Sequence, residues 1–543
     1  MLKFINPKHA KLAYQLIFLV SAVVGVLFRV SKIFTADFFR DEAFSGLLAQ
    51  KSLKDIVLIS ANDTNPPLYP ILEHFWGAIF GFNTNSLRTL SFGFAILTFG
   101  LLIYLLHLLK FNYKLKLIIL SLFILNPSLI YYAVEARYYG IVIFSSLALF
   151  TLSYKIFKLN QTRLVNWILL FFIVLFGLYN HNSFVLILLA NIIIIILMLL
   201  LKTKPSDLKA RLIEVIKDKS FKLFILIMAA DFIIYLPWLI VLKSQLAQAN
   251  QGFWLQFNPI TSPLGFAIDT TIWPLNLPSP TTLVIFSNGL LLLLIVGIIY
   301  CVTKKKYQLV LAYLGLILAT FYFASFKQPL FYIRYLVFVV PFSLIVISLG
   351  IFSLKKIRLV IYSLIVIISV FSLLEWGRPN KTDNIEAKRV VSYLNRDIAS
   401  EDYPEVYFDP LMSHNYLPDF LKDYAIRDIS EGLTGHLDRL ILNEDALTYF
   451  NIEFYSHKDN YSKILGSYAQ TPYYIGKALI PENRFINDLT TVKNDSIYLI
   501  SSNYPTDNSF KKMGEGGYTY LYTFKFDNLY LSVFAKNGNK FYE

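Results

Sequence analysis

Long apolar runs separated by short basic segments fill residues 1–375 of the chain. A helix needs about 20 apolar residues to cross the hydrocarbon core of a bilayer. We predict about eleven membrane helices, of which the third and the fifth are short. They cover residues 12–30, 87–109, 115–131, 138–157, 164–179, 183–201, 221–242, 281–302, 307–325, 332–353 and 357–375. This pattern is typical of a polytopic α-helical membrane protein.

A different pattern begins near Trp376, where apolar runs become short and alternate with polar residues. Alternation with a period of two predicts strands, here at Glu405-Val-Tyr-Phe, Asp495-Ser-Ile-Tyr-Leu-Ile and Tyr518-Thr-Tyr-Leu-Tyr-Thr-Phe. Residues 384–398 read as an amphipathic helix. We therefore expect a transmembrane domain at 1–375, with a first outer loop at 31–86, and a mixed α/β domain at 376–543.

Composition agrees with this division, because 56% of residues are hydrophobic and the mean hydropathy is +0.54. The single cysteine, Cys301, excludes an intramolecular disulfide and a cysteine-based zinc site. The net charge of +14 is unevenly spread, with +19 in residues 1–375 and −5 in the remainder. The positive charge therefore reflects membrane topology and contacts with membrane lipids, and we expect no nucleic-acid partner.

The distribution of Lys and Arg sets the expected orientation. With a cytoplasmic N-terminus, the inner segments hold 22 Lys and Arg and the outer segments hold 10. The first apolar run is followed by Arg29 and Lys32 and by no small-residue cleavage site, so we read it as a retained signal anchor. These features predict a multi-pass protein of the cell membrane with an extracytoplasmic C-terminal domain.

Carboxylates in the membrane domain gather on the predicted outer face. Residues 1–375 contain 13 acidic residues, and eight of them fall in outer loops. These eight are Asp37, Asp41, Glu42, Asp55, Asp63, Glu73, Glu135 and Asp269. Charges beside membrane spans are costly, so this clustering makes the outer face the candidate active site.

The first outer loop carries the leading candidates, Asp41 and Glu42, preceded by Arg40. Apolar spacing after this pair predicts a short helix with both carboxylates in its first turn, where the helix dipole favours them. The alternative role is a charge pair on an interfacial helix. Downstream, Pro66 and Pro67 predict a turn between two interfacial helices.

This proline turn would also position Asp63 and Asn65. Later outer loops add cations and possible hydrogen-bonding groups. They contain Glu135, Arg137, Tyr138, His181, Lys327 and Arg334. The arginines and the lysine suit a lipid phosphate. Arg137 could instead snorkel or pair with Glu135, and a lone histidine such as His181 is more often structural.

Carboxylates can remove a proton from a hydroxyl, and cations can stabilise a phosphate leaving group. The combination fits sugar transfer from a phospholipid-linked donor. A transporter would also collect charges, but its sites are expected near the bilayer midplane. Among the acidic residues only Asp231 offers such a mid-span position.

The motifs Asp41-Glu42, Asn65-Pro-Pro-Leu-Tyr69 and Leu87-Arg88 resemble those of the dolichyl-phosphate-mannose protein mannosyltransferase superfamily. Bacterial aminoarabinose transferases belong to the same group. The segment Glu135-Ala-Arg-Tyr138 and the pair Arg334-Tyr335 are also similar to family patterns. The resemblance covers residues 30–340 and departs from many relatives in having Asn65 in place of histidine.

This resemblance implies a GT-C type fold and a metal-independent, inverting hexosyl- or pentosyltransferase that uses a polyprenyl-phosphate sugar. It makes Asp41 the base, with Glu42 orienting the acceptor or tuning that base. The acceptor would be a hydroxyl on a glycan, lipid or protein. The C-terminal domain lacks the repeated β-trefoil pattern of eukaryotic protein mannosyltransferases, so protein O-mannosylation is not implied.

Three alternatives remain at this stage. The first is a transporter or flippase of lipid-linked sugars, and the second is a non-catalytic membrane scaffold. The third is a metal-dependent relative in which Asp41, Glu42 and His181 surround a divalent cation. No cofactor is expected, because the first outer loop has no Asp-x-Asp motif, and a divalent metal is the less favoured reading.

Overall fold

The computed structural model divides the chain into two compact units. The helical unit comprises Met1–Thr35 and Thr64–Arg378, and the sheet unit comprises Ala36–Asp63 and Pro379–Glu543. The described residues are 7–35, 38, 40–203, 207–249, 255–272, 280–376, 405–407, 439–443, 462–465, 485–486, 492, 496–501, 511, 513–526 and 529–536.

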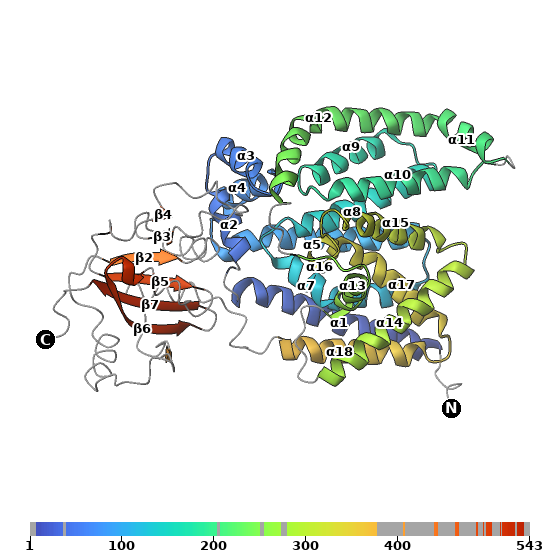
Figure 1. The fold of residues 1–543 in the computed structure, drawn as a ribbon. Helices are drawn as coiled ribbons and strands as arrows, with labels where there is room; N and C mark the ends of the chain where they lie inside the picture. The colour runs from blue at the N-terminus through green and yellow to red at the C-terminus, as the bar shows by residue number, and fades with distance from the viewer. Residues whose placement is uncertain are drawn as a thin grey trace. The chain divides into compact units, whose positions relative to one another are not determined.

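The helical unit confirms the predicted polytopic architecture, since all eleven predicted runs are helical (Figure 1). Among the described residues, seven helices are long and apolar enough to cross a membrane, and there are eight if the bent pair α6 (Tyr113–Leu125) and α7 (Pro127–Val134) is counted as one span. Three shorter apolar helices occupy the remaining runs, namely α9 (Leu164–Leu178), α10 (Phe184–Leu200) and α15 (Gln308–Ala324).

Bounds of the helices follow the chain order. The first half contains α1 (Pro7–Thr35), α4 (Leu68–Phe80), α5 (Thr84–Leu108), α6 (Tyr113–Leu125), α7 (Pro127–Val134), α8 (Tyr139–Ser153) with the π-helix η1 (Tyr154–Lys158), α9 (Leu164–Leu178) and α10 (Phe184–Leu200). The second half contains α11 (Leu208–Lys217), α12 (Lys219–Ala249), α13 (Thr261–Ile272), α14 (Pro280–Thr303), α15 (Gln308–Ala324), α16 (Ile333–Leu336), the 3-10 helix η2 (Val337–Val339), α17 (Val340–Ser353) and α18 (Arg358–Trp376).

The break between α6 and α7 bends the third predicted span by 57°. Asn126 adopts an extended backbone conformation there, and its side chain accepts a hydrogen bond from the Leu129 N–H (3.0 Å). Pro127 then starts α7 at a position where a missing N–H costs no helical hydrogen bond. The break therefore comes from a cap followed by a proline, which satisfies the backbone where the helix stops.

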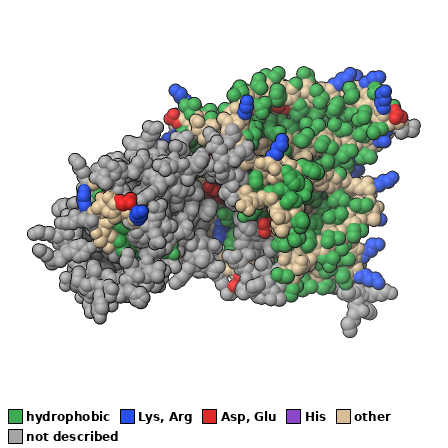
Figure 2. Space-filling model, in the orientation of Figure 1, with side chains coloured by type: hydrophobic (Ala, Val, Ile, Leu, Met, Phe, Trp, Pro, Cys, Tyr) green, Lys and Arg blue, Asp and Glu red, His purple; other side chains and the backbone are tan. Residues whose placement is uncertain are grey.

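Burial separates the inner helices from the lipid-facing ones. The spans at Tyr139–Lys158 and Ile333–Ser353 are 83% and 89% buried, whereas the span at Lys219–Leu246 is only 17% buried. Figure 2 shows hydrophobic side chains covering the flank of the helical unit and Lys and Arg side chains gathered along one end. This is the distribution that a bilayer imposes, with charges at the ends of the spans.

Two glycines allow α14 and α17 to approach closely. A Cβ added at Gly297 would collide with the Val346 carbonyl oxygen, and one added at Gly350 would collide with the Leu293 carbonyl oxygen. Small residues at helix interfaces in membranes bring backbones into van der Waals contact, which drives association there. Gly289, also on α14, has nothing within 4 Å of such a Cβ.

The first outer loop folds as its pattern predicts. Asp41 and Glu42 lie in the first turn of α2 (Arg40–Ala49), and α3 (Leu53–Ala61) follows in the same unit. Ser52 caps α3 by accepting a hydrogen bond from the Asp55 N–H (3.2 Å). The predicted proline turn separates α3 from α4, which starts at Leu68.

The sheet unit contains a seven-stranded sheet in the order β1-β6-β7-β5-β2-β3-β4. Antiparallel pairing joins β1 to β6, β6 to β7 and β7 to β5, and parallel pairing joins β5, β2, β3 and β4. The strands are β1 (Glu405–Tyr407), β2 (Arg439–Asn443), β3 (Ser462–Leu465), β4 (Phe485–Ile486), β5 (Ser496–Ser501), β6 (Tyr518–Phe526) and β7 (Leu529–Lys536). The three predicted strands are thus confirmed, while the predicted helix at 384–398 lies outside the described residues.

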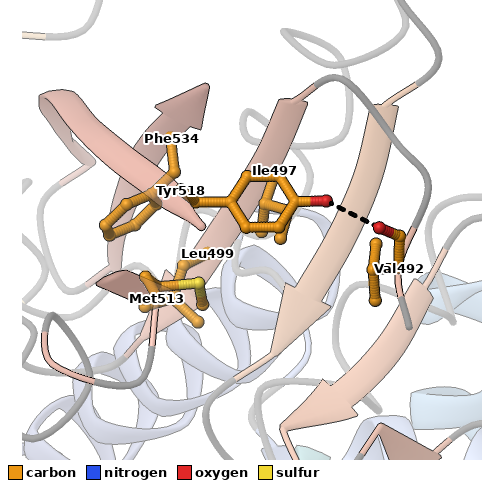
Figure 3. Packing of buried hydrophobic residues seen from close by; sticks show 6 residues of the cluster. All are labelled: Val492, Ile497, Leu499, Met513, Tyr518 and Phe534. Carbon is orange, nitrogen blue, oxygen red and sulfur yellow. Dashed lines mark hydrogen bonds between the residues drawn. The ribbon is translucent and has the colours of Figure 1, made fainter. Parts of the chain in front are cut away.

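A small apolar core holds β5, β6 and β7 together (Figure 3). Tyr518 lies in this core and donates a hydrogen bond from its hydroxyl to the Val492 carbonyl (3.4 Å). The cluster consists of Val492, Ile497, Leu499, Met513, Tyr518 and Phe534. Alternate residues of β5, Ile497 and Leu499, point into it, as strand geometry requires.

Replacing Gly297 with alanine should destabilise the helical unit, because the new methyl group meets a backbone carbonyl that cannot move without shifting α17. We expect a loss of about 1–3 kcal/mol, as for other overpacked sites. Thermal unfolding of the full chain in detergent micelles measures the change. The matched substitution Gly289→Ala should leave the midpoint unchanged or raise it slightly, and equal midpoints for both variants would contradict this packing.

Candidate active site

Three predicted outer loops converge at one end of the helical unit. They follow α7, α9 and α15 and bring together Glu135, Arg137, Tyr138, His181 and Arg334, which we call the outer-loop cluster. These residues are separated by up to about two hundred positions in the chain. The sequence placed them on the same face of the membrane, and the structure places them in one cluster.

An ion pair joins two of these loops. The Arg334 Nη2 atom lies 3.6 Å from the Glu135 Oε1 atom, with Glu135 buried and Arg334 partly exposed. Arg334 Nε also donates a hydrogen bond to the Tyr139 hydroxyl, and its guanidinium lies 5.5 Å from the Tyr139 ring centroid. A planar guanidinium held in this way presents its remaining N–H groups in a fixed direction.

The second arginine, Arg137, lies two residues after Glu135 in the chain. Its N–H donates to the Glu135 carbonyl (2.7 Å), and its guanidinium carbon lies 5.1 Å from the Tyr138 ring centroid. Within the cluster, two guanidinium groups thus accompany the single carboxylate of Glu135. Guanidinium groups are the side chains that bind an anion such as a phosphate through paired N–H groups.

His181 packs against Tyr138, with ring centroids 4.5 Å apart. Its Nδ1 accepts a hydrogen bond from the Ser183 N–H (3.1 Å) and lies 2.6 Å from the Ser183 hydroxyl. Burial, together with the charge of Arg137, lowers the pKa of His181 to about 3. The imidazole is therefore neutral at physiological pH with its proton on Nε2, so it adds no charge to the cluster.

The proline turn docks on the loop that carries His181. The Leu68 N–H donates to the Tyr179 carbonyl (3.1 Å), and the Asn182 amide donates to the Thr64 carbonyl (2.8 Å). Asn65, in this turn, donates from its side chain to the Thr64 hydroxyl (2.9 Å). The turn at Asn65 is thereby fixed beside the outer-loop cluster.

The other predicted residues lie elsewhere. Lys327 is exposed, and its side chain makes no hydrogen bond or ion pair with the described residues, so a phosphate role for it stays a prediction. In the sheet unit, Asp41 is partly buried, whereas Glu42 and Asp63 are buried. The backbone of Arg40 begins α2. The roles predicted for Arg40, Asp41, Glu42 and Asp63 also stay predictions.

Sequence reasoning missed Tyr139 as a member of this site. Its side chain is fully buried and contacts three neighbours, Tyr132, Tyr138 and Arg334. The sequence feature that could have indicated Tyr139 is the group of tyrosines between Tyr131 and Tyr139, but such a group is equally typical of the aromatic residues at a membrane interface. No group of three or more His, Cys, Asp or Glu side chains within the described ranges is placed to hold a metal ion.

The low pKa of His181 predicts a distinct acid sensitivity. In the unfolded chain the pKa of His181 is about 6.5, so above that pH the side chain is neutral in both the folded and the unfolded protein. Below that pH, His181 takes up a proton in the unfolded chain but stays neutral in the folded protein. Because of His181 alone, the free energy of unfolding should fall by about 1.4 kcal/mol for each pH unit between pH 6 and pH 4. Thermal unfolding of His181→Gln should show a shallower loss between pH 7 and 5 than that of the wild-type protein.

Exposed His107 on α5 provides the control. The variant His107→Gln should keep the wild-type dependence of the unfolding midpoint on pH. An unchanged dependence in His181→Gln would show that His181 is protonated in the folded protein, contrary to its buried position.

Comparison with known proteins identifies the fold. No protein-family model and no curated protein sequence matches the chain. Two solved structures of ArnT, an aminoarabinose transferase from Cupriavidus metallidurans, match 95% of this chain and 97% of theirs at 9% identity. The TM-score is 0.51 for the apo state and 0.55 for the state bound to undecaprenyl phosphate.

A further match, at 12% identity, is the oligosaccharyltransferase AglB from Archaeoglobus fulgidus, solved with an inhibitory peptide and a dolichol-phosphate. It covers 82% of this chain and 64% of its own at a TM-score of 0.46, below the level that indicates a shared fold. The match to ArnT extends over nearly the whole chain, so it includes the C-terminal part. The predicted resemblance is therefore confirmed at the level of the fold, and this chain is a polytopic membrane protein with the GT-C type fold of ArnT.

Proposed function

We propose that this protein is a membrane glycosyltransferase that moves a sugar from a polyprenyl-phosphate donor to a hydroxyl acceptor. The observation that carries the proposal is the outer-loop cluster, in which Arg137 and Arg334 accompany one carboxylate. It lies at the end of apolar helices, where a lipid phosphate would sit. The likeness to ArnT bound to undecaprenyl phosphate supports the same class of donor.

The lipid tail of the donor would lie against the apolar helices, since the exposed flank of the helical unit is hydrophobic (Figure 2). Its phosphate would accept hydrogen bonds from Arg334, which the Glu135 carboxylate and the Tyr139 hydroxyl hold in position. As the sugar leaves, negative charge grows on the phosphate. Preorganised guanidinium groups stabilise that charge without reorganising during the reaction.

For the base we retain Asp41, on the strength of the motif it shares with the family. Its carboxylate takes the proton of the acceptor hydroxyl, and the hydroxyl oxygen forms a bond to the anomeric carbon. The bond between that carbon and the phosphate oxygen breaks, and the electron pair leaves with the polyprenyl phosphate. Attack opposite the leaving group inverts the configuration. Glu42 would orient the acceptor or tune the base.

One donor assay tests both roles. The probe is a radiolabelled polyprenyl-phosphate sugar, with an envelope fraction from cells lacking this protein as the source of acceptor. Asp41→Asn should lower kcat by a factor of about 100 or more, because it removes general-base catalysis. Arg334→Gln should raise the KM for donor by about tenfold or more, because it removes a charge-assisted contact to phosphate.

Matched controls carry the same chemical changes at exposed positions. Asp207→Asn should be harmless because asparagine can also cap α11. Arg163→Gln should be harmless because the Arg163 side chain makes no capping hydrogen bond to α9. Both should retain wild-type kinetics. Full transfer by Asp41→Asn would refute the base assignment, and an unchanged donor KM in Arg334→Gln would refute its phosphate contact.

A further inference from the structure

A cavity lies beside the outer-loop cluster in the helical unit. It has a volume of about 240 Å³ and is bounded by α13, the segment before it and residues 329–332. We call it the α13 cavity. Its lining includes Phe257, Phe266, Asp269, Phe331 and Tyr332.

Aromatic rings form the walls of the α13 cavity. Phe331 packs edge-on against Phe266, with centroids 5.4 Å apart, and lies 6.3 Å from Phe257. Behind the wall, Phe257 packs edge-on against Tyr322 and Phe326, at 5.6 and 5.2 Å. Because the rings contact one another, their faces toward the cavity are fixed. Such walls with a few polar groups are the usual lining of a small-molecule site.

Asp269 provides the charged group of this cavity. The backbone around it is anchored to α7, because Asn126 donates to the Thr270 carbonyl (2.8 Å) and Ser128 donates to the Asp269 carbonyl (3.2 Å). Its carboxylate makes no hydrogen bond or ion pair with the described residues. Desolvation raises the pKa of Asp269 to about 6. A ligand with hydroxyl groups would restore the hydrogen bonds that this carboxylate lacks.

Tyr332 connects the cavity to the outer-loop cluster. Burial raises the pKa of its hydroxyl, the charge of Asp269 raises it further, and the charge of Arg334 lowers it. Tyr332 thus lies within electrostatic range of both the carboxylate in the cavity and the guanidinium in the cluster. A ligand group in the α13 cavity would be close to a phosphate bound at Arg334.

We propose that the α13 cavity is a sugar-binding subsite that takes one hydroxyl-bearing sugar ring. Phe257 and Phe331 would contact the apolar face of the ring, and Asp269 and Tyr332 would bind its hydroxyl groups. The volume is below the roughly 300–1,000 Å³ of sites for drug-sized ligands, which fits one ring. The inference rests on the proposed function, since the ring would belong to the donor or to the acceptor.

Direct binding tests the subsite without requiring transfer. The probes are methyl glycosides of mannose, glucose, galactose and arabinose, measured by saturation-transfer-difference NMR on the full chain in detergent micelles. We expect binding of at least one glycoside, weakened about tenfold or more in Asp269→Asn and in Phe331→Ala. The controls Asp207→Asn and Phe323→Ala replace exposed side chains and should bind as the wild type does.

Thermal unfolding of each variant shows whether it is folded, and Phe331→Leu is a milder substitution should Phe331→Ala fail to fold. Absence of binding by all four glycosides, or equal binding by wild type and both variants, would overturn the subsite. If the wild-type protein binds a glycoside and both variants lose that binding, but the wild-type protein consumes no donor, the subsite stands and only the proposed function is refuted. If the protein is active, the substrate whose KM is raised in Asp269→Asn and Phe331→Ala, donor or acceptor, is the one that supplies the ring.

Discussion

A bilayer offers no water to the backbone or to charged side chains, and this constraint organises the whole helical unit. Each span must satisfy its own N–H and C=O groups, so it is a helix. Most Lys, Arg, Asp and Glu residues of the unit therefore lie near the ends of the spans or in the segments between them, and Asp231, buried in the middle of α12, is an exception. Chemistry that needs several carboxylates and cations together is thereby favoured at the two faces of the membrane.

Local hydrogen bonds compensate two other polar features within the spans. Arg29 lies buried near the end of α1, and its guanidinium donates to the carbonyls of Gly25 (2.9 Å) and Ile124 (2.7 Å). The break at Asn126 exposes backbone groups within a predicted span, and the Asn126 side chain accepts from one of them. The side-chain amide of the same residue donates to α13, so the break also anchors the helix that carries Asp269.

Sequence alone predicted the parts of the fold that depend on local pattern. The eleven apolar runs, the first-turn position of Asp41 and the proline turn at Pro66 follow from composition and spacing, and the structure confirms each. Contacts between distant loops could not be predicted in this way. The pairing of Glu135 with Arg334 depends on how α7 and α16 are placed by the packing of the helices between them. The α13 cavity was missed because α13 is too short and too polar to read as a span.

The proposed activity breaks the sugar–phosphate bond of a lipid-linked donor, whereas a transporter would move the donor intact. Phosphorus NMR of a polyprenyl-phosphate sugar, incubated with the purified full chain and an acceptor-containing envelope fraction, tests this most directly. We predict that the phosphodiester signal decays as a phosphomonoester signal of polyprenyl phosphate grows in equal amount. A phosphodiester signal that persists while the donor crosses the bilayer of reconstituted vesicles would contradict the account.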